Sequence, residues 1–207
     1  MSGGRHPDLP GQLTDSAALA DTPLAWPVSS TSREFSNPYL TVDIDTIVDP
    51  DDGEHSRVVV QPHGAVGIMA VDDHDRILIV EQYRHPVRHR VLEIPAGTLD
   101  VAGEDPLEAA VRELAEEADL AADDWSQELE LFATPGYSSE RWTVFRASGL
   151  RAVPHEDRID RHAEEADMKQ WWLPFDAAVD GVLDGRISDG MTVAAVLAEQ
   201  VRRSRAV

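Results

Sequence analysis

The segment that most constrains the fold of this 207-residue chain spans residues 97–120, GTLDVAGEDPLEAAVRELAEEADL. Its middle carries the signals for the start of a helix. Asp105 suits the N-cap position, Pro106 suits the first helical position, and Glu108 follows the cap by three residues, as in a capping box. The pattern predicts a loop that leads into an acidic helix ending at about Ala118.

At about 100° per residue, this helix has an apolar stripe beside an acidic arc. The residues predicted to face the core are Leu107, Ala110, Val111, Leu114 and Ala118. Glu113, Glu116 and Glu117 flank that stripe, which holds their carboxylates close to the protein body. Their mutual repulsion, about a few tenths of a kcal/mol per pair, would be relieved by a divalent cation. Such all-oxygen ligands suit Mg²⁺ or Mn²⁺, whereas a solvated acidic face is the alternative that the glutamates alone leave open.

The order of residues along this segment resembles the signature of the Nudix hydrolase family, Gly…Glu…Arg-Glu-Leu-x-Glu-Glu-x-Gly-Leu. The matching positions are Gly97, Glu104, Arg112, Glu113, Leu114, Glu116, Glu117 and Leu120. One extra residue lies between Gly97 and Glu104, a variation associated with the ADP-ribose pyrophosphatase branch. Asp119 stands where the family usually has Gly, and Asp tolerates the left-handed conformation expected there better than most residues.

The resemblance implies a role for each charged residue of the signature. The expected metal ligands are Glu113, Glu117 and the Ala96 carbonyl, with Glu116 and Glu104 as further ligands or as partners of the ligands. Arg112 would orient the carboxylates. The implied cofactor is Mg²⁺, with Mn²⁺ as the alternative.

The composition sets limits on partners. The net charge is −21, from 39 acidic and 18 basic side chains. Such a chain should be repelled by nucleic acid and by anionic membranes, so neither is expected as a partner. Cysteine is absent, which excludes disulfides and thiolate metal sites. The sequence shows no signal-peptide pattern and no apolar run of membrane-spanning length, and a cytoplasmic location is the default expectation.

The chain is predicted to have three parts. Residues 1–30 are rich in small and polar residues without periodicity, which predicts a mobile tail. Residues 31–62 contain two apolar-alternating segments around a turn and are predicted to form a β hairpin that serves dimerisation. Residues 63–207 would form the Nudix hydrolase domain. Its predicted strands cover 64–71, 76–82, 91–94, 127–134, 141–147 and 170–173, and further helices cover 175–183 and 192–203.

Many strands, one central helix and a C-terminal helix imply an α+β fold. The resemblance specifies a Nudix-type mixed β-sheet sandwiched between helices, with a small N-terminal antiparallel sheet. In this branch that sheet commonly builds a homodimer and helps to hold adenine, for which Phe35 and Tyr39 are candidate stacking partners. Of the neighbouring Trp171 and Trp172, one ring is expected to face the core.

Residues 83–90, YRHPVRHR, form a dense basic cluster in this acidic chain. They are either a clamp for a diphosphate, since arginine donates two-pronged hydrogen bonds, or a solvated loop that balances nearby glutamates. Gln-Tyr-Arg at this place resembles the same branch, where the arginine, Arg84 here, meets the substrate. Glu93 lies inside an apolar run and needs a partner. An ion pair and a substrate contact are both open for it, and the resemblance favours contact with the nucleotide or ribose.

Two later loops carry the remaining candidates. The sequence ATPGYSSE at 133–140 resembles the ADP-ribose pyrophosphatases, and the candidate substrate contacts are Pro135, Gly136 and Glu140, together with Gly97. Residues 152–166 are long and polar, as in a flexible surface loop or a lid. Within them, the stretch from 162 resembles the loop that supplies the catalytic carboxylate. Glu165 is the first choice for the base that takes a proton from the attacking water, and Glu164 is the second.

Three functional hypotheses follow. The first is a metal-dependent pyrophosphatase that cleaves ADP-ribose to AMP and ribose 5-phosphate. The second keeps this chemistry on another nucleotide sugar or a dinucleotide, which the catalytic segment does not distinguish. The third is a non-catalytic Nudix module that binds a nucleotide. Such a module would be expected to lose the acidic residues of the signature, and here Glu113, Glu116 and Glu117 are all present.

Overall fold

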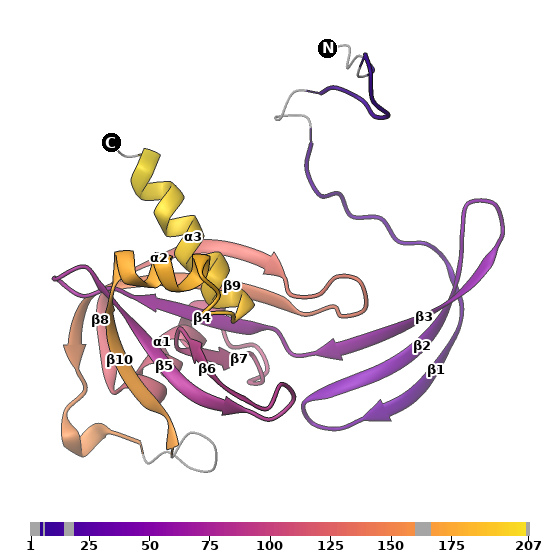
Figure 1. The fold of residues 1–207 in the computed structure, drawn as a ribbon. Coiled ribbons are helices and arrows are strands. Elements are labelled where there is room, and N and C mark those ends of the chain that lie inside the picture. Colours follow the sequence, from indigo (N-terminus) through magenta and orange to yellow (C-terminus); the bar gives the residue numbers. More distant parts are fainter. Residues whose placement is uncertain (1–4, 6, 15–18, 160–166, 206–207) are drawn as a thin grey trace. The chain divides into compact units, whose positions relative to one another are not determined.

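The computed structural model describes residue 5 and residues 7–14, 19–159 and 167–205. The chain divides into two compact units. One comprises residues 1–31 with 45–57, and the other comprises residues 32–44 with 58–207. The larger unit contains all the described helices (Figure 1).

Three N-terminal strands form a sheet in the order β1-β2-β3. They are β1 (Val28–Ser36), β2 (Leu40–Val48) and β3 (Glu54–Pro62). The short connections between consecutive strands are those of an antiparallel meander. The predicted hairpin corresponds to β2 and β3. Strand β1 was not predicted, because VSSTSREFS lacks the alternation of a half-buried strand, and every residue of β1 is exposed.

The larger unit is built on two further sheets. Four strands pair in the order β7-β4-β9-β8, and three pair in the order β10-β5-β6. Strand β4 runs parallel to β9, whereas β4–β7 and β8–β9 are antiparallel, so the four-stranded sheet is mixed. The strands are β4 (Ala65–Ala70), β5 (Arg76–Arg84), β6 (His89–Glu93), β7 (Ala96–Thr98), β8 (Leu120–Phe132), β9 (Arg141–Ala152) and β10 (Lys169–Pro174).

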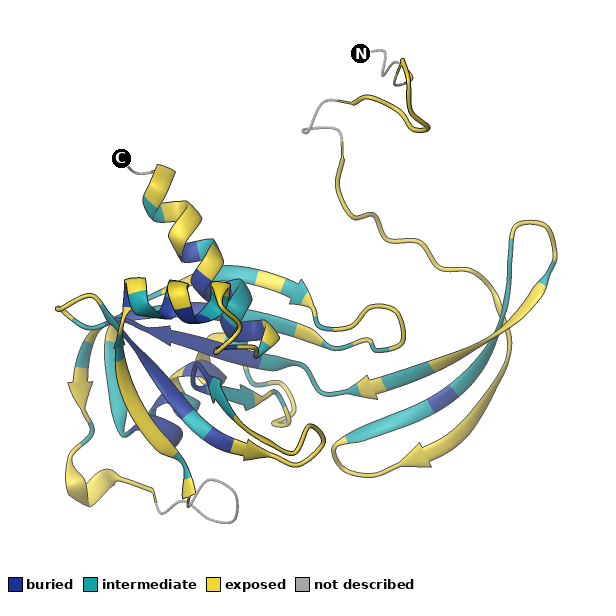
Figure 2. Ribbon diagram, viewed as in Figure 1, coloured by how far each residue is buried: buried dark blue, intermediate teal, exposed yellow. Residues whose placement is uncertain are grey.

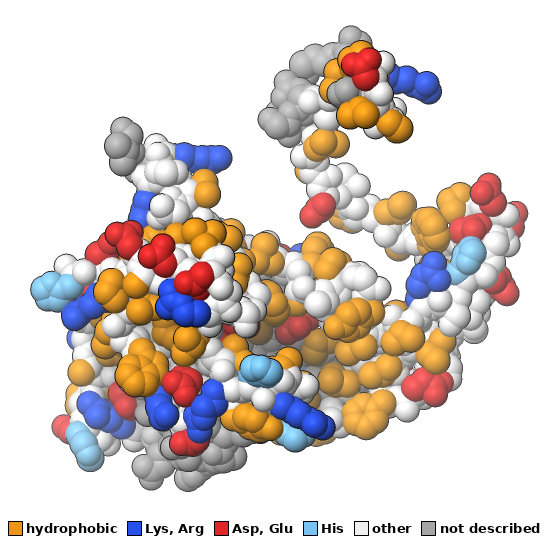
Figure 3. All heavy atoms as spheres, viewed as in Figure 1, with side chains coloured by type: hydrophobic (Ala, Val, Ile, Leu, Met, Phe, Trp, Pro, Cys, Tyr) orange, Lys and Arg blue, Asp and Glu red, His pale blue; other side chains and the backbone are white. Residues whose placement is uncertain are grey.

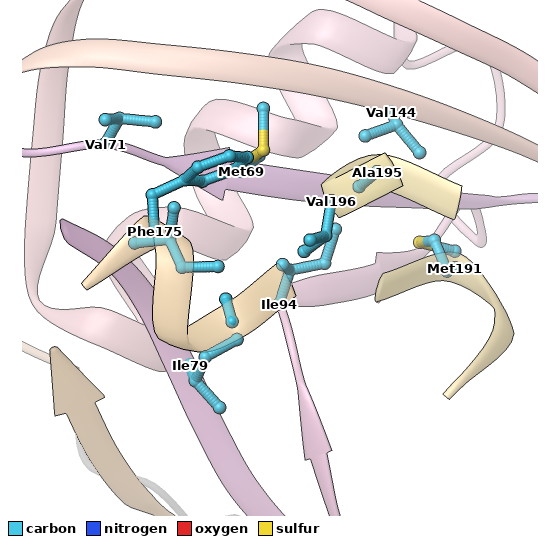
Figure 4. Close-up of a cluster of buried hydrophobic side chains, with 11 residues drawn as sticks. Met69, Val71, Ile79, Ile94, Val144, Phe175, Met191, Ala195 and Val196 are labelled. Carbon is cyan, nitrogen blue, oxygen red and sulfur yellow. The ribbon is translucent and has the colours of Figure 1, made fainter. Parts of the chain in front are cut away.

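Helices cover both sides of β4. Val66 and Ile68 pack in a buried cluster with α1 (Pro106–Ala118), whereas Met69 packs in a second cluster with α2 (Phe175–Leu183) and α3 (Gly190–Arg205). Alternation along a strand sends successive side chains to opposite faces, which explains the two clusters. Figure 2 shows the buried strands between the helices, and Figure 4 shows the second cluster. The prediction of a mixed sheet sandwiched between helices is confirmed.

Helix α1 begins and ends as predicted. The Asp105 side chain accepts a hydrogen bond from the Leu107 N–H at 2.9 Å, and Asp119 takes a left-handed conformation with φ 55° and ψ 34°. Its buried face differs from the predicted stripe. Leu107 and Val111 are 37% and 44% exposed, and Ala109 is buried instead. The small side chains of this face let the helix approach the sheet through a narrower band than periodicity indicates.

Two further differences concern β8 and the tryptophans. Strand β8 begins directly at Leu120, earlier than the predicted residue 127. The prediction that one tryptophan faces the core is wrong, because Trp171 and Trp172 are 51% and 39% exposed. Both lie on β10, which is an edge strand and therefore has a neighbour on one side only. No described helix combines the length and the apolar composition that crossing a membrane requires.

Candidate functional site

The signature glutamates gather around one guanidinium on α1. Arg112 donates two hydrogen bonds to Glu104, from Nε to Oε1 at 3.0 Å and from Nη2 to Oε2 at 3.1 Å. Its Nη1 donates to Glu113 Oε1 at 2.7 Å and to Glu116 Oε2 at 3.1 Å. A fork of fixed donors holds three carboxylates in defined positions. This arrangement is the one that the predicted orienting role of Arg112 requires.

The charges in this cluster stabilise one another. The hydrogen bond with Glu104 is the largest cause that raises the pKa of Arg112, and the charges of Glu113 and Glu116 raise it further, against the opposing effect of burial. The hydrogen bond from Arg112 lowers the pKa of Glu104 below its usual value. Both groups are therefore ionised at neutral pH, and the cluster carries more negative than positive charge.

Glu117 and the strand β7 meet on the inner side of α1. Glu117 is only 5% exposed, and its Oε2 accepts a hydrogen bond from the Ala96 N–H at 2.9 Å. A Cβ atom on Gly97 would lie 1.9 Å from Cδ of Glu113, so the glycine makes room for the position that the Glu113 side chain takes here. The structure thus brings together four predicted site residues, Ala96, Gly97, Glu113 and Glu117.

The donor set fits a hard divalent cation by its chemistry, since it consists of carboxylates close to a backbone segment. Within residues 5, 7–14, 19–159 and 167–205, however, no three acidic or histidine side chains already stand in a metal-binding arrangement. Arg112 engages the carboxylates of Glu113 and Glu116 instead. Each of these two carboxylates receives the guanidinium on one oxygen, Glu113 on Oε1 and Glu116 on Oε2.

A pocket of about 900 Å³ opens beside this cluster. Its walls come from the β5–β6 hairpin, β7, the start of β9 and the loop between α2 and α3. Four of the predicted substrate residues line it: Arg84, Glu93, Gly97 and Glu140. Pro135 and Gly136 are not among its lining residues. Their loop pairs with β3, where the Val60 N–H donates to the Tyr137 carbonyl at 2.8 Å.

Arg84 and Glu93 form an ion pair in this pocket. Arg84 Nη2 lies 2.6 Å from Glu93 Oε2, and Gln82 Nε2 donates to the same oxygen at 3.1 Å. The hydrogen bond with Glu93 is the main cause that raises the pKa of Arg84. The Glu93 side chain is only 6% exposed whereas that of Arg84 is 45% exposed, so the arginine faces the pocket and the glutamate holds it.

The rest of the basic cluster is partly balanced by acids. Arg90 pairs with Asp167 and lies 3.7 Å from Glu81, and His89 Nδ1 lies 2.7 Å from the Val87 carbonyl oxygen. Figure 3 shows basic side chains next to acidic ones on the visible face of the larger unit. Arg84 and Arg90 both line the pocket and both pair with acids, so a diphosphate clamp and a charge-balancing loop both stay open for this cluster.

Sequence reasoning missed the wall formed by the loop between α2 and α3. Arg186, Ser188 and Asp189 from this loop line the pocket, as does Trp142 of β9. Asp189 also caps α3, since its Oδ2 accepts from the Thr192 N–H at 2.8 Å. The signal that could have found this wall is the Ser-Asp-Gly sequence at 188–190, which is typical of a helix start.

Other predicted residues remain without a place in the site. Glu164 and Glu165 lie outside the described residues. Phe35 and Tyr39 are exposed, at 51% and 71%, and no described contact links them to the pocket. Their roles stay predictions.

Comparison with known proteins identifies the family of the chain. A family model described as NUDIX domain matches residues 61–192. The chain is 46% identical over 149 residues to a protein of Mycobacterium tuberculosis named ADP-ribose pyrophosphatase, covering 72% of this chain and 70% of that protein. It is 32% identical over 166 residues to a protein of Bacillus methanolicus named Methanol dehydrogenase activator, covering 80% and 88%.

A solved structure described as an ADP compounds hydrolase superposes with a TM-score of 0.74 at 19% identity, covering 90% of this chain and 98% of that one. At this identity the likeness bears on the fold alone. The family match spans the signature helix, the pocket and the start of α3. This chain belongs to the Nudix family.

Proposed function

We propose that this chain hydrolyses the diphosphate of ADP-ribose to AMP and ribose 5-phosphate, with Mg²⁺ or Mn²⁺ as its cofactor. The observation that carries the proposal is the meeting of Glu113 and Glu117 with Ala96 and Gly97 at the edge of a pocket lined by Arg84. The relative from Mycobacterium tuberculosis supports ADP-ribose as the substrate.

The acidic cluster is suited to hold the cofactor. Glu113 and Glu117 would be direct ligands, with the Ala96 carbonyl, Glu116 and Glu104 as further ligands or partners. A divalent cation supplies positive charge against the diphosphate and makes a water molecule a better nucleophile. Without it, an anionic substrate would be repelled by the carboxylates of this cluster.

Arg84 would bind a phosphate of the substrate. Its guanidinium is fixed by Glu93 and faces the pocket. A held guanidinium loses less rotational freedom on binding than a mobile one, so Glu93 stabilises the bound state indirectly. Glu140 and Gly97 line the same pocket and would contact the substrate. Arg112 would keep the glutamates oriented, and Glu165, or else Glu164, would accept the proton of the attacking water.

A second candidate differs only in the substrate. A pocket of about 900 Å³ is large enough for several nucleotide diphosphates, so another nucleotide sugar or a dinucleotide fits the same chemistry. The homodimer, the cytoplasmic location and the adenine contacts of Phe35 and Tyr39 remain predictions from the sequence.

A substrate panel tests the proposal. Wild-type protein with Mg²⁺ would be given ADP-ribose, other nucleotide sugars and dinucleotides, and kcat/KM would be measured from AMP or the corresponding mononucleotide. The proposal predicts the highest kcat/KM for ADP-ribose. A higher value for another nucleotide diphosphate would favour the second candidate, and tight ADP-ribose binding without hydrolysis would favour a non-catalytic module.

A further inference from the structure

A buried threonine joins α3 to the backbone segment that carries the site. Thr192 lies in the first turn of α3, and its side chain exposes none of its surface. Its Oγ1 accepts a hydrogen bond from the Ile94 N–H at 2.9 Å, across 98 residues of sequence. The same hydroxyl donates to Asp189 Oδ2 at 2.7 Å. The hydroxyl is therefore fixed in one orientation, because it both accepts and donates a hydrogen bond.

The segment from Glu93 to Gly97 is tied down from three sides. Thr192 holds the Ile94 N–H, and the Ile68 N–H of β4 donates to the Pro95 carbonyl at 2.7 Å. On the third side, the Ala96 N–H donates to Glu117 of α1. Figure 4 shows Ile94 within the cluster that contains the start of α3. Each bond comes from a different element, so the path of this segment is set by all three together.

The segment serves both halves of the site. Its first residue, Glu93, holds Arg84 in the pocket. Ala96 bonds Glu117, and Gly97 makes room for Glu113. A small displacement of Ile94 would therefore move the guanidinium clamp and the acidic cluster relative to each other. Displacements of this kind reduce catalysis strongly even when the substrate still binds.

We propose that Thr192, locked by Asp189, is a positioning residue that sets the backbone of residues 93–97 and so aligns the acidic cluster with the pocket. It does not touch the substrate itself. This role goes beyond the structural helix that the sequence alone predicts for this part of the chain. Its kinetic consequence rests on the proposed function, whereas its consequence for the backbone does not.

The test compares two buried substitutions on α3. Thr192→Val keeps the shape but removes the hydroxyl, which leaves the Ile94 N–H without its partner. Val196→Ala creates a small cavity in the buried cluster that also contains Ile94, but it removes no hydrogen bond, so it controls for lost packing and lost stability. Thr192→Ser restores the hydroxyl. If Thr192→Val does not fold, Asp189→Asn, which weakens the lock on the hydroxyl, takes its place.

The first readout is hydrogen exchange of the metal-free protein. Thr192→Val should speed exchange at residues 93–97 by about tenfold, whereas Val196→Ala should not do so selectively. The second readout is the affinity for Mn²⁺ alone, which should fall in Thr192→Val only. The third is ADP-ribose hydrolysis, where kcat should fall about tenfold with KM within about threefold, a change of about 1.4 kcal/mol in the barrier. Thr192→Ser should recover most of each loss.

Unchanged exchange at residues 93–97 in Thr192→Val would overturn the proposal, as would equal effects in Val196→Ala. These two outcomes remain decisive even if wild-type protein releases no AMP, which would sink the proposed function instead. A rise in KM with kcat unchanged would also contradict a positioning role.

Discussion

Glutamates in two regions of the molecule differ in how many arginine partners they have. On α1, the carboxylates of Glu104, Glu113 and Glu116 all receive hydrogen bonds from the single guanidinium of Arg112. On α3, the buried carboxylate of Glu199 is contacted by two guanidinium groups. Arg203 Nε lies 2.8 Å from it, and Arg202 also pairs with it. Around Arg112 three carboxylates share one guanidinium, whereas on α3 one buried carboxylate has several arginine partners, which also pair with Asp75 and Glu128.

The α3 cluster has the features of a structural clasp. Arg203 also bonds Asp75 in the turn before β5, with Nη2 to Oδ1 at 2.7 Å, and it stacks on the ring of Phe175 at 3.7 Å. Arg146 Nε of β9 approaches Glu199 to 3.9 Å. These contacts join α3 to the turn before β5, to β9 and to α2. We therefore expect a bound cation where several carboxylates share one guanidinium, as around Arg112, and none where one buried carboxylate already has several arginine partners, as at Glu199.

The largest expected effect belongs to the α1 cluster. Glu117→Gln should keep the fold, since the amide oxygen can still accept from the Ala96 N–H, but a neutral amide is a poorer ligand for a hard cation. We expect kcat for ADP-ribose to fall by at least about 100-fold, or about 2.7 kcal/mol. Circular dichroism would verify the fold. A variant within tenfold of wild type would remove Glu117 from the catalytic machinery.

The matched change in the α3 cluster should affect stability instead. Glu199→Gln leaves its arginines without their buried counter-charge, which we expect to cost about 2 kcal/mol in the free energy of unfolding, because these arginines are partly exposed. Hydrolysis should remain within about twofold of wild type, since the site is distant. Urea unfolding and steady-state kinetics measure the two quantities. A large loss of kcat in this variant would break the contrast between the clusters.

Removal of Arg112 sharpens the comparison further. Arg112→Met should lower the Tm of the metal-free protein by about 5 °C, because the carboxylates lose their shared partner. Added Mg²⁺ should raise the Tm of this variant more than that of wild type, since the cation replaces the missing charge. The exposed pair Arg141–Glu130 supplies the control, and Arg141→Met should shift the Tm little with or without Mg²⁺. If Mg²⁺ raised the Tm of Arg112→Met no more than it raised the Tm of wild type and of Arg141→Met, the result would argue against cation binding at α1.

The smallest effect concerns pH and the α3 clasp. The hydrogen bond from Arg203 is the largest cause that lowers the pKa of Asp75 below its ordinary 3.8. A lowered folded-state pKa adds stability above the unfolded value and loses it as pH falls through the folded value. Asp75→Asn should therefore cost about 0.5 kcal/mol at pH 6, and the difference should close below about pH 4. Denaturant unfolding of both proteins at pH 6 and at pH 3 measures this difference in free energy. A difference at pH 3 as large as that at pH 6 would contradict the prediction.

The sequence predicts local structure well where the signals lie close together. The cap at Asp105 and the stop at Asp119 are confirmed, because each depends on the residues next to it. The nearly continuous apolar run at 64–71 and the adjacent strand at 76–82 likewise correspond to the buried strands β4 and β5. The width of the buried face of α1 is not predictable in this way. Whether Val111 or Ala109 is buried depends on how closely the sheet approaches the helix.

The parts of the site that the sequence does not predict depend on distant contacts. Nothing local to Thr192 indicates that its hydroxyl accepts a hydrogen bond from Ile94, which lies between β6 and β7. The pair Arg84–Glu93 could be anticipated once β5 and β6 are known to be neighbours. Glu93 also lines the pocket, so its contact with the substrate stays a prediction. The loop before α3 and the first residues of α3 line the pocket because α3 packs on β4. The periodicity of the sequence does not reveal this packing.

The most direct test of the contrast is to locate a cation. Crystals grown with Mn²⁺ and a non-hydrolysable ADP-ribose analogue would be measured for anomalous scattering. The account predicts a manganese peak coordinated by Glu113 and Glu117 at the pocket edge, with Arg112 turned away from at least one carboxylate, and no peak beside Glu199. A well-ordered complex without manganese at α1, or with the ion only at α3, would contradict it.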